Sequence, residues 1–67
     1  MKYVLFLERQ ITDNKFDRVY INTFENWLHF IVAYTSLKET FTKMGLKVET
    51  QITQDNEFKH GKIIIYN

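Results

Sequence analysis

The chain has 67 residues, of which 45% are hydrophobic and 16% are aromatic, and its 9 Lys and Arg against 8 Asp and Glu leave a net charge of +1. We expect a single domain, residues 1–67, and a domain this small buries only about 60% of the surface that its unfolded chain exposes. Without Cys, neither disulfides nor thiolate-bound metal support the core, which leaves dense aromatic packing or burial against another chain. The near-neutral charge disfavours a protein that coats DNA through a large basic surface.

No apolar run approaches the roughly 18 to 20 residues that a membrane-spanning helix needs. The first ten residues carry Lys2, Glu8 and Arg9 and no small-residue cleavage site. We therefore expect an unprocessed cytoplasmic protein without a membrane partner. Ile, Lys, Asn, Phe and Tyr supply 29 residues, whereas Gly, Ala, Arg and Pro supply 5. AT-rich codons produce this bias, which is typical of a phage, a plasmid or a low-GC bacterium.

The N-terminal third has the pattern of a β-hairpin. Residues 2–8 are apolar on both alternating faces, as expected of a central strand. Residues 12–15 form a polar turn, since Asx side chains tolerate turn conformations and bond their own backbone. Residues 16–21 then return as a second strand.

The middle of the chain predicts an amphipathic helix. Asn22 can cap it, with Glu25 three residues later in a capping box, and Thr23 is an equally good cap. The helix ends near Met44, where Gly45 suits the C-terminal cap. The apolar arc drifts by about 100° along the helix, so we expect a kink near residues 35–36 or a second contacted surface. That arc contains Phe24, Trp27, Leu28, Ile31, Tyr34, Leu37, Phe41 and Met44.

The C-terminal third predicts a second hairpin. Residues 46–53 alternate cleanly between apolar and polar, and residues 57–66 return as the last strand. A two-residue turn at residues 55–56 places Glu49 opposite Lys62 and Val48 opposite Ile63. Gly61 within the last strand indicates a bulge or a close backbone approach.

The predicted fold is α+β, with the order ββαββ and a single helix on one face of a four-stranded mixed sheet. The first and last strands are apolar on both faces, which places them at the centre and predicts the spatial order 2-1-4-3. This is the arrangement of the β-grasp fold and of immunoglobulin-binding domains of the protein G type, although the chain carries no sequence motif of either.

One helix covers only one face of such a sheet, and the other face is predicted to bind a partner. Whichever way the first strand faces, it exposes apolar side chains among charges, either Tyr3, Leu5 and Leu7 or Val4 and Phe6, which is typical of a protein or dimer interface. The matching register of the first hairpin is ambiguous, because it opposes Arg9 and Arg18. The predicted partner-binding residues are Tyr3, Leu5, Leu7, Arg9, Arg18, Tyr20, Phe58, Lys62, Ile64 and Tyr66.

Other site types have weaker support. No Cys nucleophile, triad spacing or Gly-rich phosphate loop is present, so we expect no enzymatic activity and no cofactor. Glu25 with His29 forms an ordinary helix-surface pair, and Asp55 is a turn former near Glu57 and His60, so no metal site is predicted. Trp27 is either a core anchor or an interface hot spot, and His29 is expected to be solvated.

The sequence thus predicts a small protein-binding module, in the most concrete version a phage or plasmid accessory protein that inhibits a host factor by occluding its surface in the host cytoplasm. A single-stranded nucleic-acid binder is the first alternative, because aromatic and basic residues alternate on the same face. A homodimeric structural protein of a low-GC bacterium or its phage is the second.

Overall fold

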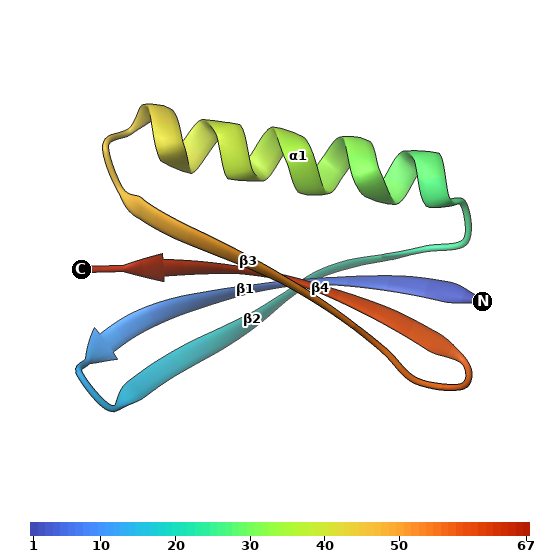
Figure 1. The fold of residues 1–67 in the computed structure, drawn as a ribbon, viewed down its shortest axis with the longest axis horizontal. Helices are drawn as coiled ribbons and strands as arrows, with labels where there is room; N and C mark the ends of the chain where they lie inside the picture. The colour runs from blue at the N-terminus through green and yellow to red at the C-terminus, as the bar shows by residue number, and fades with distance from the viewer.

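The computed structural model describes all 67 residues and shows one α-helix lying across one face of a four-stranded sheet (Figure 1). The strand order is β2-β1-β4-β3, with β1 and β4 parallel and both hairpins antiparallel. The predicted ββαββ fold with spatial order 2-1-4-3 is therefore confirmed. The elements are β1 (Lys2–Thr12), β2 (Lys15–Phe24), α1 (Trp27–Lys43), β3 (Lys47–Gln54) and β4 (Phe58–Tyr66).

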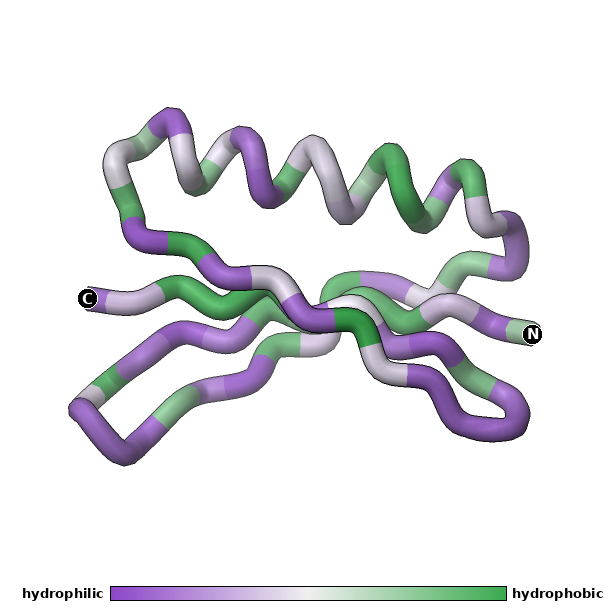
Figure 2. The backbone as a smooth tube through the Cα atoms, in the orientation of Figure 1, coloured by the Kyte–Doolittle hydropathy of each residue, from purple (hydrophilic) through white to green (hydrophobic).

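The hydrophobic core is a thin layer between α1 and the two central strands. Only 7 of the 67 residues are buried, and the core cluster joins Leu5 of β1 and Ile63 of β4 to Phe30 and Tyr34 of α1. The edge strand β3 alternates between hydrophobic and hydrophilic residues, the central strands β1 and β4 carry continuous apolar runs, and both hairpin turns are hydrophilic (Figure 2). The central strands therefore place apolar side chains on both faces of the sheet, of which the helix covers one.

Gly61 lets the helix approach the sheet closely. A Cβ atom at this position would lie 2.5 Å from Cζ of Phe30 and 3.0 Å from Cδ1 of Tyr34. The register of β4 with both neighbours is continuous at Gly61, so of the two predicted explanations the close approach is correct and the bulge is wrong.

The first hairpin is longer than predicted and has a different register. Glu8 pairs with Arg18 and Arg9 with Asp17, so the opposition of Arg9 and Arg18 is avoided. This arrangement is favoured because opposite charges face each other on both sides of the sheet. The strands reach Thr12 and Phe24, with irregularities at Ile11 and Ile21 where the register shifts.

The second hairpin turns one residue later than predicted. Val48 lies opposite Ile65 and Glu49 opposite Ile64, a two-residue shift from the expected pairs that leaves the same side chains on each face. The Asp55 carboxylate accepts hydrogen bonds from the N–H groups of Glu57 and Phe58, at 3.1 and 2.8 Å. Asp55 therefore opens the turn as an Asx residue, and does not occupy its centre.

Helix α1 starts at Trp27, after an Asn26 cap whose side chain accepts from the N–H groups of Leu28 and His29. The predicted caps Asn22 and Thr23 are wrong, because both positions pair with β1. The helix is continuous through residues 35–36, and Gly45 follows it with φ +84°, the conformation expected of its C-terminal cap.

The buried face of α1 differs in part from the predicted arc. Phe30 was not on that arc, yet it is fully buried at the centre of the core. Leu28 and Met44 were on it, but they are 64% and 65% exposed. The helix begins later than predicted, so Phe24 belongs to β2 and is not part of the buried face of the helix. It packs against Phe30 from β2.

We expect Gly61→Ala to lower the free energy of unfolding by about 1–3 kcal/mol, because the added methyl group overlaps a buried ring. Urea unfolding followed by circular dichroism measures this loss. In a Phe30→Leu background the ring atoms that cause the overlap are absent, so the cost of Gly61→Ala should be smaller there. A Gly61→Ala protein as stable as the wild type would contradict the close approach.

The Asp55 turn predicts a pH dependence of stability. The backbone N–H of Phe58, and then that of Glu57, lower the pKa of Asp55 from its ordinary 3.8. A carboxyl whose pKa is lower in the folded state stabilises the fold above its unfolded pKa, and this contribution is lost as the pH falls through the folded pKa. Asp55→Ala should therefore lower the urea midpoint at pH 7, and its difference from the wild type should narrow below pH 3.8.

Asp55→Asn is the matched control, since it keeps an acceptor oxygen without the charge. The difference in urea midpoint between Asp55→Asn and Asp55→Ala should be independent of pH. A difference in urea midpoint between the wild type and Asp55→Ala that stays constant into strong acid would contradict the role of the charged carboxylate.

Candidate interaction surface

The candidate surface is the face of the sheet opposite α1, here called the open sheet face. Tyr3, Leu5 and Leu7 of β1 pack against the helix-side core, so the alternate residues Val4, Phe6 and Glu8 point to the open sheet face. The paired residues of the other strands share this side. They include Phe16, Arg18 and Tyr20 of β2, Lys47, Glu49 and Gln51 of β3, and Phe58, His60, Lys62, Ile64 and Tyr66 of β4.

An aromatic row crosses three strands of this face. The ring centroids of Phe58 and His60 are 6.0 Å apart, those of His60 and Phe6 are 5.9 Å apart, and those of Phe6 and Tyr20 are 6.1 Å apart. These distances are typical of interacting rings, so the row is ordered by its own contacts. Tyr20, at the β2 end of the row, is 56% exposed.

A charged row runs beside the aromatic row, with one carboxylate placed between two cations. Glu8 lies 3.3 Å from Arg18 and 3.3 Å from Lys62, one oxygen to each cation. The side chain of Glu8 is only 15% exposed. Arg18 also lies over the Phe6 ring, 5.1 Å from its centroid, which ties the two rows together. Both cations are thus already partnered within the chain.

A second aromatic pair lies on the open sheet face, at the start of β2 and the end of β4. Phe16 and Tyr66 meet edge to face at 5.8 Å. The Tyr66 hydroxyl donates to Glu49 at 3.0 Å, and Lys47 lies 5.6 Å from the Tyr66 ring centroid. The hydrogen bond to Glu49 is the main reason that the pKa of Tyr66 is raised from its ordinary 10.0, because only the protonated hydroxyl can donate it.

Six of the ten predicted partner-binding residues lie on the open sheet face. Tyr3, Leu5 and Leu7 do not, because they face α1, and Leu5 is fully buried in the core. Arg9 shares their side of β1 and lies 3.7 Å from Asp17. The six correctly placed residues are Arg18, Tyr20, Phe58, Lys62, Ile64 and Tyr66.

The first strand has the second of the two orientations considered for it, the one that places Val4 and Phe6 on this face. Sequence reasoning missed Glu8 and Phe16 as parts of this face. The signal was the unfavourable opposition of Arg9 and Arg18. Shifting that register by one residue opposes Glu8 and Arg18, which turns the first strand over and exposes Phe6.

Trp27 packs at the edge of the core, and its alternative role as an interface hot spot stays a prediction. Its ring packs against Tyr3 and Phe30, with centroids 5.4 and 5.6 Å away, yet it is 41% exposed. Lys59 covers part of it, 4.4 Å from the ring centroid. Trp27 therefore anchors the start of α1 at the margin of the core, on the side away from the open sheet face.

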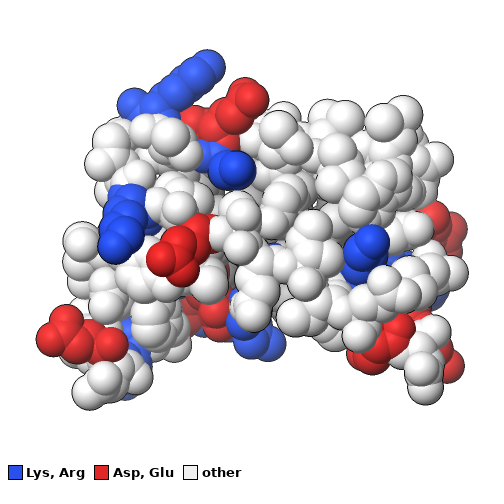
Figure 3. Space-filling view, in the orientation of Figure 1, with Lys and Arg blue, Asp and Glu red and all other residues white.

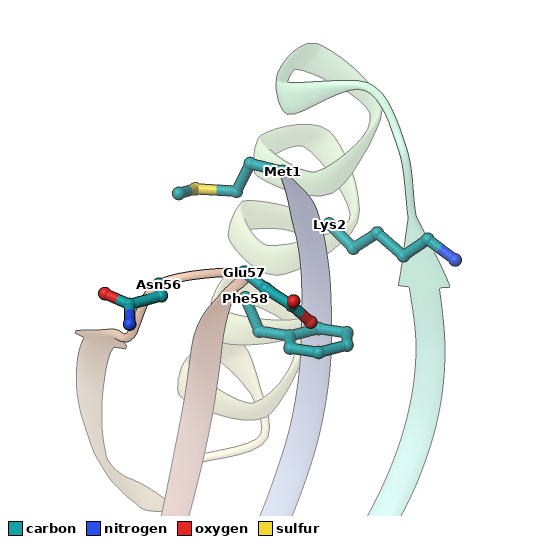
Figure 4. A pocket seen from close by; sticks show the side chains of 5 residues that line it. All are labelled: Met1, Lys2, Asn56, Glu57 and Phe58. Carbon is teal, nitrogen blue, oxygen red and sulfur yellow. The ribbon is translucent and has the colours of Figure 1, made fainter.

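The remaining surface offers little concave structure. A shallow hollow of about 520 Å³ lies between the start of β1 and the β3–β4 turn. Its lining side chains, Met1, Lys2, Asn56, Glu57 and Phe58, spread in different directions and do not converge on a point (Figure 4). No three His, Cys, Asp or Glu side chains come together in a metal-binding arrangement.

Charges of both signs are interspersed around the molecule. On the side shown in Figure 3, Lys and Arg lie among Asp and Glu, and the broadest uncharged area covers the N-terminal half of α1. Residues 26–37 contain no charged side chain, and within them Leu28 and Val32 are 64% and 57% exposed. α1 is neither long nor apolar enough to span a bilayer.

No protein-family model, curated protein or solved structure matches the chain.

The charged row predicts a difference between two similar substitutions. Glu8→Gln leaves two partly covered cations without their counter-charge, and we expect it to lower the free energy of unfolding by about 1 kcal/mol in low salt. Asp17→Asn is the control, since the Arg9–Asp17 pair is more than half exposed and should contribute no more than about 0.5 kcal/mol. Urea unfolding at low and high salt measures both, and equal losses would contradict a central role for Glu8.

Proposed function

We propose that this protein is a small non-enzymatic protein-binding module that engages its partner through the open sheet face. The observation that carries the proposal is an ordered aromatic surface whose neighbouring cations, Arg18 and Lys62, are both paired with Glu8. Interfaces are enriched in Tyr, Phe and Arg, and their centres are depleted of other charged residues. The aromatic row, with Arg18 beside it, has this composition.

The thin core supports the same proposal. With 7 of 67 residues buried, the domain has little apolar surface hidden from water, and binding a partner to the folded state adds stability by mass action. The aromatic rings are held by one another before binding, so little side-chain entropy is lost on association. The mechanism we propose is occlusion, in which the open sheet face covers a functional surface of the target protein.

A single-stranded nucleic-acid binder is the second candidate, because exposed rings on a sheet can stack on bases. The aromatic row favours it, whereas the charged row opposes it. Arg18 and Lys62 are both paired with Glu8, so the three groups leave only one net positive charge beside the rings to neutralise phosphates.

Partner capture through Tyr20 tests the proposal. A photo-crosslinking amino acid at this exposed position should trap a specific protein in lysate of the cell that makes or receives the protein. The purified partner should then bind Tyr20→Glu at least about tenfold more weakly than the wild type, because a charge replaces an exposed ring of the aromatic row. Isothermal titration calorimetry measures the difference.

Val32→Glu is the matched control, since Val32 is equally exposed but lies on α1. Binding that survives Tyr20→Glu and is lost with Val32→Glu would place the interface on the helix and contradict the proposal.

Fluorescence anisotropy with a single-stranded oligonucleotide tests the second candidate. We expect no binding at low salt, and binding that weakens steeply with added salt would favour the nucleic-acid function.

A further inference from the structure

The two free edges of the sheet differ in how well they resist pairing with another strand. The edge strand β2 is interrupted, because the register with β1 shifts at Ile21, and it carries Lys15, Asp17 and Arg18. Bulges and charges are the devices by which proteins block edge-to-edge association. The β2 edge is therefore protected.

The opposite edge, β3, has neither device over most of its length. Its register with β4 runs through eight consecutive pairs without a shift. The only charged residues of β3 are Lys47 and Glu49, at its start, and residues 50–54 are uncharged. The chain has no Pro to interrupt it. β3 thus offers a regular, uncharged row of backbone hydrogen-bonding groups to a further strand.

We propose that a second copy of this chain occupies the β3 edge. The two β3 strands pair antiparallel about a two-fold axis that passes beside Thr50, and the two sheets join into one of eight strands. Isologous pairing of this kind is the commonest form of dimer symmetry.

Charge and hydropathy select Thr50 as the centre. A pairing centred on Glu49 opposes two carboxylates, and one centred on Ile52 opposes Glu49 and Asp55. A pairing centred on Val48 overlaps for only three residues of each strand, because β3 begins at Lys47. A pairing centred on Gln51 sets Val48 against Gln54 and Ile52 against Thr50, apolar against polar.

The pairing centred on Thr50 avoids all of these faults. It runs from residue 47 to residue 53 of each copy and opposes no like charges. Val48 of each copy meets Ile52 of the other on the helix side of the sheet, and Ile52 is 41% exposed in the single chain. Glu49 meets Gln51 on the open sheet face, where carboxylate and amide can hydrogen-bond. Thr50 meets its own counterpart, a favourable cross-strand pair.

This inference does not depend on the proposed function, because the β3 edge and the open sheet face are different surfaces. A two-fold axis perpendicular to the sheet keeps both open faces on the same side. The dimer would therefore present one continuous surface of twice the area, and both helices would lie on the opposite side.

Sedimentation equilibrium of the full chain tests the inference, and we expect twice the mass of one chain for the wild type. Thr50 is the only position that meets itself, so Thr50→Lys and Thr50→Glu should each give a single-chain mass through like-charge repulsion. Mixing the two variants should restore the doubled mass, because Lys then opposes Glu. Circular dichroism verifies that each variant folds.

Val19→Lys on the β2 edge is the matched control and should leave the wild-type mass unchanged, since Val19 is 51% exposed on the other edge strand. A wild type that sediments as a single chain at every concentration overturns the inference. So does a doubled mass that survives Thr50→Lys, or a mixture of the two Thr50 variants that stays at single-chain mass.

Discussion

The contact between the Phe30 ring and the backbone of Gly61 is the constraint on which the rest of the structure depends. Gly61 lies in the central strand β4, and the absence of a side chain there lets the ring reach the sheet. Leu5 and Ile63 pack around this point and are fully buried with it. The position of the helix and the choice of the covered face follow from that single close approach.

The uncovered face is stabilised by a different set of interactions. A single helix cannot cover both faces of the sheet, so the side chains opposite it contact one another. The rings of Phe6, Tyr20 and His60 line up, and Glu8 pairs with both Arg18 and Lys62. This arrangement produces an ordered aromatic row beside a charge cluster in which one carboxylate and two cations leave a net charge of +1. The ordered rings are the physical basis of the proposed partner binding.

The topology could be predicted from the sequence because the signals for it are local and agree with one another. The apolar pattern of residues 2–8 and the run of Ile63, Ile64 and Ile65 identified the two central strands, and Gly45 marked the helix end. Gly61 predicted a close approach of the backbone, although only the three-dimensional structure identifies Phe30 as the side chain that makes it.

Registers were harder to predict than elements, since each hairpin could pair in more than one way at similar cost. The face of the first strand depended on whether Arg18 opposed Glu8 or Arg9, and the second turn depended on a side-chain hydrogen bond of Asp55. The helix start was missed because Asn22, a good cap by residue type, takes part in strand pairing. Tertiary pairing outweighed local preference at that position.

The central claim is that the two faces of the sheet have different roles, one packed against α1 and one open to a partner. The adjacent residues Ile63 and Ile64 of β4 point to opposite faces, so their methyl groups report on both in one experiment. The most direct measurement is the relaxation of these methyl signals by a neutral soluble gadolinium chelate, followed by NMR. We expect strong relaxation of the Ile64 methyl signals and weak relaxation of the Ile63 signals. Equally weak relaxation of both would show that the face opposite α1 is already covered, which would contradict an open sheet face.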